Sequence, residues 1–87
     1  MSLLDDFGAA QLRVKQLREQ PSIDELLDLY ALYKQGTLAD VQTKRPDMLD
    51  IRGRAKWDAW TRRKGMTKDD AMRAYVDLVA KLVAQQG

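Results

Sequence analysis

Two tyrosines and a lysine stand close together in the segment YALYKQ, residues 30 to 35. Tyr30, Tyr33 and Lys34 have the spacing i, i+3 and i+4, so on a helix all three lie along one stripe. An ammonium attracts phosphate, a phenol hydroxyl donates hydrogen bonds, and a phenol ring offers a flat face for stacking. The stripe therefore suits an anionic ligand that also has an aromatic part.

Two later segments carry groups of the same kind. Lys56 is flanked by Arg52 and Arg54, and Tyr75 lies in the last predicted helix. Lysine and arginine bind phosphates, and flat side chains stack on a purine. Together these groups suit a nucleotide-like head group. The spacing leaves one alternative open, in which the tyrosines are core residues with their hydroxyls at the rim.

Catalytic and metal-binding chemistry is poorly represented. The chain has no histidine and no cysteine, so serine or cysteine triads and zinc sites of the usual ligands are excluded. Ser2 and Ser22 both precede helical patterns, where a helix cap is the simpler role. Three acidic pairs fall in first turns of predicted helices, where they favour the helix dipole: Asp5/Asp6, Asp24/Glu25 and Asp69/Asp70. We predict no enzyme activity, no metal and no cofactor.

Length and composition predict one domain over residues 1–87. Apolar residues make up 45% of the 87, enough for a modest core, and the net charge is only +2. Residues 52 to 64 nevertheless hold six bases and one acid, which predicts a local basic surface. No secretory signal and no long apolar run is present, and the lack of cysteine is compatible with a reducing compartment. We expect a cytoplasmic monomer.

The apolar residues recur with helical periods throughout, and no segment alternates long enough for a strand. A first helix, capped by Ser2, has the stripe Leu3, Phe7, Ala10, Val14 and Leu17. A second begins near Ile23 with a capping box at Ser22 and Glu25. Its predicted inner stripe is Ile23, Leu26, Leu27, Tyr30, Tyr33 and Lys34. Leu29 and Leu32 lie on another side, so burial on more than one face is expected, and Gly36 is the predicted end.

Residues 37 to 52 lack a clear period and contain Pro46, which predicts a long connection. Its apolar residues are expected to pack against the protein: Leu38, Val41, Met48, Leu49 and Ile51. A third helix runs from about Gly53 to before Gly65, with Trp57 and Trp60 as core residues. A fourth begins near Thr67 and has the stripe Ala71, Tyr75, Leu78, Val79 and Leu82. The fold class is an all-α four-helix bundle.

Residues 29–60, LYALYKQGTLADVQTKRPDMLDIRGRAKWDAW, together with KGMTKDDAMRAYVDLVAKL at 64–82, resemble the acyl-CoA-binding protein family. The resemblance extends from Phe7 to about Leu82. It implies an up-down-down-up bundle with a long overhand connection between helices 2 and 3. It also implies reversible binding of long-chain acyl-CoA thioesters without catalysis.

The resemblance also implies a set of ligand contacts. Residues that match head-group positions are Tyr30, Tyr33, Lys34, Lys56 and Tyr75, with Lys15 in the first helix. Among them Tyr30, Lys34 and Lys56 would hold chiefly the ribose 3′-phosphate, and Tyr33 the adenine side. Residues that match positions near the acyl chain are Phe7, Ala10, Leu26, Leu27 and Ala55.

The sequence departs from the usual family pattern in and near the long connection. Leu38–Asp40 reads LAD where VGD is common, Asp47 replaces a usual glycine, and Ile51 replaces a common phenylalanine. Arg52 and Arg54 stand where lysines are frequent. No head-group residue is lost through these changes.

The expected partner is one long-chain acyl-CoA per chain, with transient contacts to membranes or to acyl-CoA-using enzymes. Two alternatives remain: a small helical nucleic-acid-binding domain that uses residues 52–64, and a protein-interaction bundle whose tyrosines are only core. The modest net charge and the lack of helix-turn-helix spacing count against nucleic acid.

Overall fold

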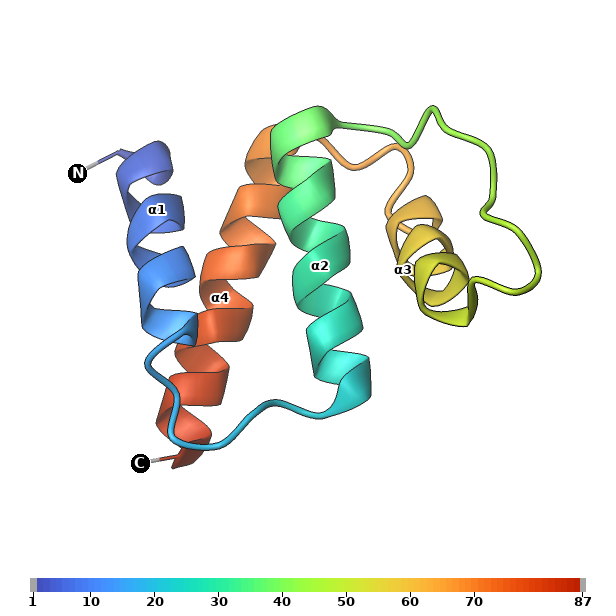
Figure 1. Cartoon of the computed structure of the whole chain (residues 1–87). Coiled ribbons are helices and arrows are strands. Elements are labelled where there is room, and N and C mark those ends of the chain that lie inside the picture. Colours follow the sequence, from blue (N-terminus) through green and yellow to red (C-terminus); the bar gives the residue numbers. More distant parts are fainter. Residues whose placement is uncertain (1, 87) are drawn as a thin grey trace.

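The computed structural model describes residues 2–86, so the first and last residues of the predicted domain lie outside it. It contains the helices α1 (Leu3–Val14), α2 (Ile23–Leu38), α3 (Ile51–Thr61) and α4 (Lys68–Gln86). In Figure 1, α1 and α4 run in one direction and α2 in the other. Helix α4 packs against both α1 and α2, and α3 packs against α2. The predicted all-α four-helix fold is confirmed, with the long connection before α3.

The starts of the helices follow from local sequence. Ser2 and Ser22 each accept a hydrogen bond from the backbone N–H three residues on, at 3.1 Å, and both capping boxes are complete. Thr67 accepts the N–H of Asp70 in the same way. The predicted first helix is too long, because α1 ends at Val14. Leu17 still packs against the core, but from the chain that follows α1.

The prediction for α2 was wrong for part of its inner stripe and right for the other side of the helix. Ile23 and Tyr33 of the stripe are exposed, whereas Leu29 and Leu32 are buried, as expected. The reason is that α4 and α3 cover other faces of α2, so the side that carries the predicted stripe stays partly open. Gly36 does not end the helix, which continues to Leu38.

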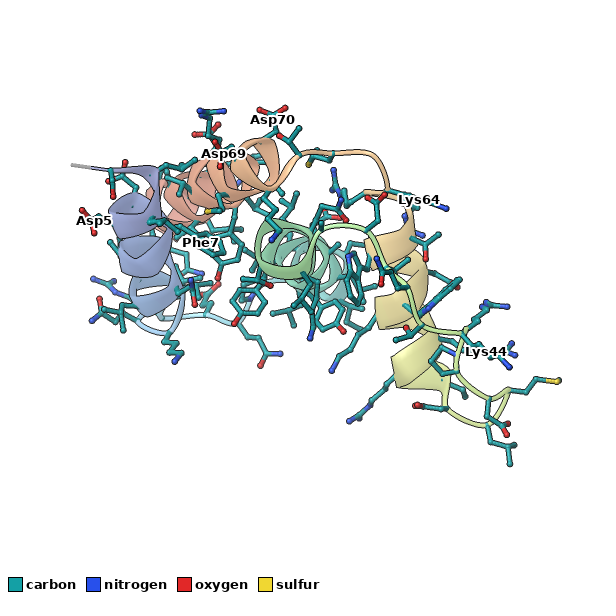
Figure 2. The ribbon with its side chains drawn as sticks, turned by 90° about the horizontal axis from the view of Figure 1, so that it is seen from above. Asp5, Phe7, Lys44, Lys64, Asp69 and Asp70 are labelled. Carbon is teal, nitrogen blue, oxygen red and sulfur yellow. The ribbon has the colours of Figure 1, made fainter. Side chains whose placement is uncertain are left out.

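Gly36 instead permits close packing between α2 and α4. It is buried, and a Cβ atom at this position would lie 3.1 Å from the Cγ atom of Met72 and 3.6 Å from the ring of Phe7. Figure 2 shows Phe7 on the side of α1 that faces α2 and α4. The core is one cluster shared by these three helices, made of Phe7, Ala10, Leu29, Leu32, Met72, Tyr75, Val79 and Leu82.

The connection over residues 39–50 leaves its large apolar side chains exposed except for half-buried Val41, contrary to the expectation from the sequence. Met48 is 75% exposed, Leu49 92% and the following Ile51 77%. Polar contacts hold the connection on α3 instead: Trp57 Nε1 donates to the carbonyl of Thr43 at 3.0 Å. Among the helices of residues 2–86, α2 alone packs against α3, so the connection has no second helix there against which to bury these side chains.

Two further contacts fasten the same connection. The guanidinium of Arg45 donates to both carboxylate oxygens of Asp58, at 3.0 and 2.8 Å. This pairing lowers the pKa of Asp58. Arg54 Nε donates to the carbonyl of Pro46 at 2.8 Å. The main chain of the connection is therefore held in place although its apolar side chains project outward.

Ala39 adopts a backbone conformation that suits glycine. Its φ of 64° and ψ of −144° lie where a Cβ atom is strained, directly after α2. We expect Ala39→Gly to raise the free energy of unfolding by about 1 kcal/mol, because the strain is removed. Urea denaturation followed by circular dichroism measures this change.

Ala80→Gly is the matched control, since Ala80 is an exposed residue inside α4. Glycine inside a helix costs about 1 kcal/mol relative to alanine, so the control should lose stability. A loss of stability in both variants would show that Ala39 is not strained.

Candidate functional site

Two lysines from different helices meet at one tyrosine ring. Lys34 of α2 places its Nζ atom 5.7 Å from the ring centroid of Tyr30, and Lys56 of α3 places its own at 5.4 Å. Lys34 Nζ also lies 5.8 Å from the ring of Trp60. Tyr30 is half-buried and Lys56 is exposed. The arrangement concentrates two ammonium groups beside an aromatic face, where an anion can reach both.

Buried Gln35 holds α3 in the position that this meeting requires. It is 0% exposed, and its Nε2 donates at 2.8 Å to both Asp40 Oδ1 and the carbonyl of Met66. Its Oε1 accepts the indole N–H of Trp60 at 3.1 Å. Because Gln35 follows Lys34 on α2 and Trp60 lies one turn after Lys56 on α3, this amide sets the spacing between the two lysines.

Asp40 extends the same network to the chain that follows α3. Its Oδ1 also accepts the backbone N–H of Gly65, at 2.8 Å. The hydrogen bonds from Gly65 and then from Gln35 lower the pKa of the Asp40 carboxyl, because they stabilise the carboxylate. The network therefore fastens the C-terminal end of α3 and the chain that follows it to the end of α2.

A first cavity, of about 580 Å³, lies on one side of Tyr30. Its wall comes from the chain between α1 and α2 together with α2 and α4. The lining residues are Val14, Lys15, Leu17, Arg18, Glu19, Gln20, Pro21, Leu26, Leu29, Tyr30, Tyr33 and Tyr75. Lys15 and Arg18 provide two cations, and the tyrosines provide ring faces and hydroxyls.

A second cavity, of about 470 Å³, lies between α2 and α3. It is lined by Gln20, Ile23, Leu26, Leu27, Tyr30, Arg52, Ala55 and Lys56. Tyr30, Leu26 and Gln20 line both cavities, so the two spaces adjoin at Tyr30. Half of the residues that line the second cavity are aliphatic, and its two cations, Arg52 and Lys56, are both on α3.

Three aromatic rings support the first cavity. Phe7 and Tyr33 are stacked, with centroids 6.0 Å apart, and Phe7 meets Tyr75 edge-on at 5.1 Å. Tyr75 is only 5% exposed, whereas Tyr33 is 38% exposed. Burial, and then the neighbouring Tyr33, raises the pKa of the Tyr75 phenol, so it stays protonated and able to donate.

The structure separates the predicted residues into two groups. Every predicted head-group residue except Lys34 lines one of the cavities, and Lys34 reaches Tyr30. Of the predicted acyl-chain residues, Leu26, Leu27 and Ala55 line the second cavity. Phe7 and Ala10 lie in the core instead, and neither lines a cavity.

Sequence reasoning missed Arg18 and Gln20, which line the cavities from the chain between α1 and α2. This chain has no periodic pattern, so nothing in the sequence indicated which of its side chains turn inward. The last described residue of α4 holds this chain in place. The side-chain amide of Gln86 accepts the N–H of Glu19 at 3.2 Å and donates to the carbonyl of Glu19 at 2.7 Å.

The acidic residues in the first turns of α1 and α4 lie away from this site. Asp5, Asp69 and Asp70 point outward at the starts of α1 and α4 in Figure 2. Within residues 2–86, no cluster of three or more acidic side chains could hold a metal ion. Trp60 is buried as predicted, whereas Trp57 is half-buried beneath the connection.

Comparison with known proteins adds an independent observation. The family model described as acyl CoA binding protein matches residues 5–79. The chain belongs to the acyl-CoA-binding protein family. This match includes most of α1, all of α2 and α3 and most of α4, so both cavities and the two lysines fall within it.

Relatives in the acyl-CoA-binding protein family cover nearly the whole chain. Acyl-CoA-binding protein homolog 1 of Caenorhabditis elegans is 54% identical over 81 residues, which is 93% of this chain and 94% of the relative. The crystal structure of Oryza sativa Acyl-CoA-Binding Protein 2 has a TM-score of 0.93 at 36% identity, over 97% of this chain and 93% of that one. The solution structure of the yeast protein has a TM-score of 0.71 at 42% identity, over 91% and 92% of the two chains.

Proposed function

We propose that this protein binds long-chain fatty acyl-CoA thioesters reversibly and carries them without chemical change. The observation that carries the proposal is the meeting of Lys34 and Lys56 at the ring of Tyr30. This point adjoins one cavity rich in tyrosine and cations and another to which both α2 and α3 contribute aliphatic side chains. Acyl-CoA has both a phosphorylated nucleotide head and an apolar chain, so it matches both environments.

The head group is assigned to the side of the lysines and the first cavity. Phosphates would meet the ammoniums of Lys34 and Lys56 and the hydroxyl of Tyr30, with charge-assisted hydrogen bonds. The adenine would lie near Tyr33, which is partly exposed, while Tyr75 and Lys15 contribute from the cavity wall. Because these contacts are charged and exposed, binding should weaken as salt is raised.

The acyl chain is assigned to the second cavity, along Leu26, Leu27 and Ala55. Each methylene removed from water contributes about 0.8 kcal/mol, so even a partly sheltered chain adds much affinity. Phe7 and Ala10 stay in this proposal as residues behind the site: Phe7 stacks on Tyr33, and both are buried in the core.

Because each chain has one head-group cluster, we propose one ligand per chain. We also propose that the protein is a monomer and that it acts in the cytoplasm. The sequence lacks histidine and cysteine, so no serine or cysteine triad of the usual kind accompanies the site. No described helix is both long and apolar enough to cross a bilayer. We also propose brief contacts with membranes and with enzymes that supply or use acyl-CoA.

The nucleic-acid alternative gains no support from the basic segment. Arg63 lies 3.5 Å from Asp28 and Arg54 donates to a backbone carbonyl, so part of the positive charge is already engaged. The protein-interaction alternative leaves the meeting of two lysines at Tyr30 without a purpose. Acyl-CoA binding accounts both for the basic segment, which contains Lys56, and for the meeting of the two lysines at Tyr30.

Lys34→Met and Lys56→Met are each expected to weaken hexadecanoyl-CoA binding by roughly 1.5–3 kcal/mol, the scale of a hydrogen bond to a charged group. Methionine keeps much of the side-chain length while it removes the charge. Isothermal titration calorimetry measures the affinity. Because both lysines act on one group, their effects should be non-additive in the double variant.

Lys81→Met is the matched control, because Lys81 is an exposed residue of α4 that lines neither cavity. Its affinity should equal that of the wild type. Circular dichroism on every variant separates a loss of binding from a loss of folding. Normal affinity in a folded Lys34→Met/Lys56→Met variant would contradict the proposed site.

A further inference from the structure

Three large apolar side chains of the connection and the start of α3 are exposed, as is Ile23 at the start of α2, and the four are here named the apolar rim: Ile23, Met48, Leu49 and Ile51. They are 77%, 75%, 92% and 77% exposed, respectively. Three of the four fall within four residues of the long connection and the start of α3. Grouped apolar side chains of this kind mark interaction sites more often than single exposed ones.

The main chain presents the apolar rim in a defined turn. Asp47 accepts the N–H of Leu49 through its carboxylate, at 3.0 Å, and its carbonyl accepts the N–H of Asp50 at 2.9 Å. Asp50 in turn caps α3 by accepting the N–H of Gly53, at 2.9 Å. A Cβ atom at Gly53 would collide with the Asp50 carboxylate, so glycine is required for this cap. Each acid therefore contributes a backbone contact that directs the neighbouring apolar side chains outward.

The charges along residues 44–58, which carry three of the four rim residues, are mainly positive. Residues 44–58 contain five bases and three acids. Asp58 is paired with Arg45, and the carboxylates of Asp47 and Asp50 accept backbone N–H groups. Lys44, Arg52 and Lys56 are exposed. Figure 2 shows Lys44 on the connection, at the edge of the molecule farthest from α1.

We propose that the apolar rim docks on the surface of an anionic lipid bilayer. Met48, Leu49 and Ile51 would enter the interface, and Lys44 and Arg52 would face lipid phosphates. Apolar side chains combined with cations are the pair of signals that gives reversible interfacial binding. A stable protein partner requires about 800 Å² on each side, which a border of four side chains does not provide alone.

The location of the rim gives this docking a purpose, which rests on the proposed function. Ile23 and Arg52 line the cavity assigned to the acyl chain, and Arg52 directly follows Ile51. Docking through the rim would thus set that cavity beside the bilayer. Acyl-CoA is itself amphiphilic, so its apolar chain could pass between the two environments over a short path.

The test is sedimentation with sucrose-loaded phosphatidylcholine vesicles, with and without about 30% phosphatidylserine. The wild type should sediment with the anionic vesicles and much less with the neutral ones. Leu49→Ser/Ile51→Ser should reduce the bound fraction at least about tenfold, the size expected for one or two lost apolar side chains. Lys44→Gln should reduce it by about fivefold on anionic vesicles only.

Leu4→Ser/Leu12→Ser is the matched control, because these leucines are 69% and 63% exposed on α1, away from the rim. It should bind vesicles as the wild type does. Equal losses in this control, or no vesicle binding by the wild type, would overturn the proposal. In the second case a protein partner would be the occupant to seek.

The same variants separate this proposal from the proposed function. Leu49 and Ile51 line neither cavity, so Leu49→Ser/Ile51→Ser should bind hexadecanoyl-CoA in solution with wild-type affinity. Loss of vesicle binding with intact ligand binding supports the rim. If the wild type binds vesicles but does not bind acyl-CoA, the proposed function is refuted and the proposal that the rim docks on membranes is retained.

Discussion

Hexadecanoyl-CoA is expected to bind at least about a hundredfold more tightly than CoA itself, because only the ester brings apolar methylenes into the second cavity. Four methylenes taken fully out of water already contribute about 3 kcal/mol, which corresponds to more than a hundredfold. Leu26, Leu27 and Ala55 supply the apolar lining that this requires. Calorimetric titration of both ligands into the same protein preparation measures the difference.

Hexadecanoic acid is the complementary ligand, since it has the same chain without the phosphates. It should bind much more weakly than the ester, because it offers nothing to Lys34 and Lys56 beyond one carboxylate. A shorter ester, octanoyl-CoA, should fall between CoA and hexadecanoyl-CoA. Equal affinities for the acid and the ester would show that the lysines do not recognise the head group.

The second large effect is expected at Gln35, where Gln35→Ala should lower the free energy of unfolding by about 3 kcal/mol. The substitution opens a cavity in a fully buried place and removes hydrogen bonds to Asp40, Met66 and Trp60. The carbonyl of Met66 loses this buried partner, whereas Trp60 keeps the carbonyl of Ala39 at 2.9 Å. Urea denaturation measures the loss.

Gln85→Ala serves as the control for that measurement, because Gln85 is an exposed glutamine of α4. Its stability should stay within about 0.5 kcal/mol of the wild type. Folded Gln35→Ala protein should also bind hexadecanoyl-CoA more weakly, since α3 is no longer held at its distance from α2. A loss below about 1 kcal/mol would mean that other contacts keep α3 in place.

Local sequence predicted the helices well where capping chemistry decides their boundaries. Ser2 and Ser22 mark the starts of α1 and α2 because each hydroxyl can accept a hydrogen bond from the backbone N–H three residues on. Tyr30 and Lys34 could be placed together because they are i, i+4 on one helix. That Lys56 joins them depends on how α3 packs on α2, and only the resemblance to a family supplied this contact in advance.

Burial was predicted well for α1 and α4 but poorly for the inner stripe of α2 and for the connection, because it depends on which neighbours an element has. The stripe from Ile23 to Lys34 is apolar enough to suggest a core, yet α4 packs on the side of Leu29 and Leu32. The outward side chains of Met48 and Leu49 follow from hydrogen bonds that hold the main chain of the connection on α3. Such tertiary contacts leave no period in the sequence.

The most direct test of the proposed site compares hexadecanoyl-CoA with its 3′-dephospho analogue by calorimetry, on the wild type and on Lys34→Met/Lys56→Met. The wild type should prefer the phosphorylated ligand by roughly 1.5–3 kcal/mol, because its two ammoniums meet that phosphate at Tyr30. The variant should bind both ligands with nearly equal affinity. A variant that keeps the full preference would place the phosphate elsewhere and contradict the assignment.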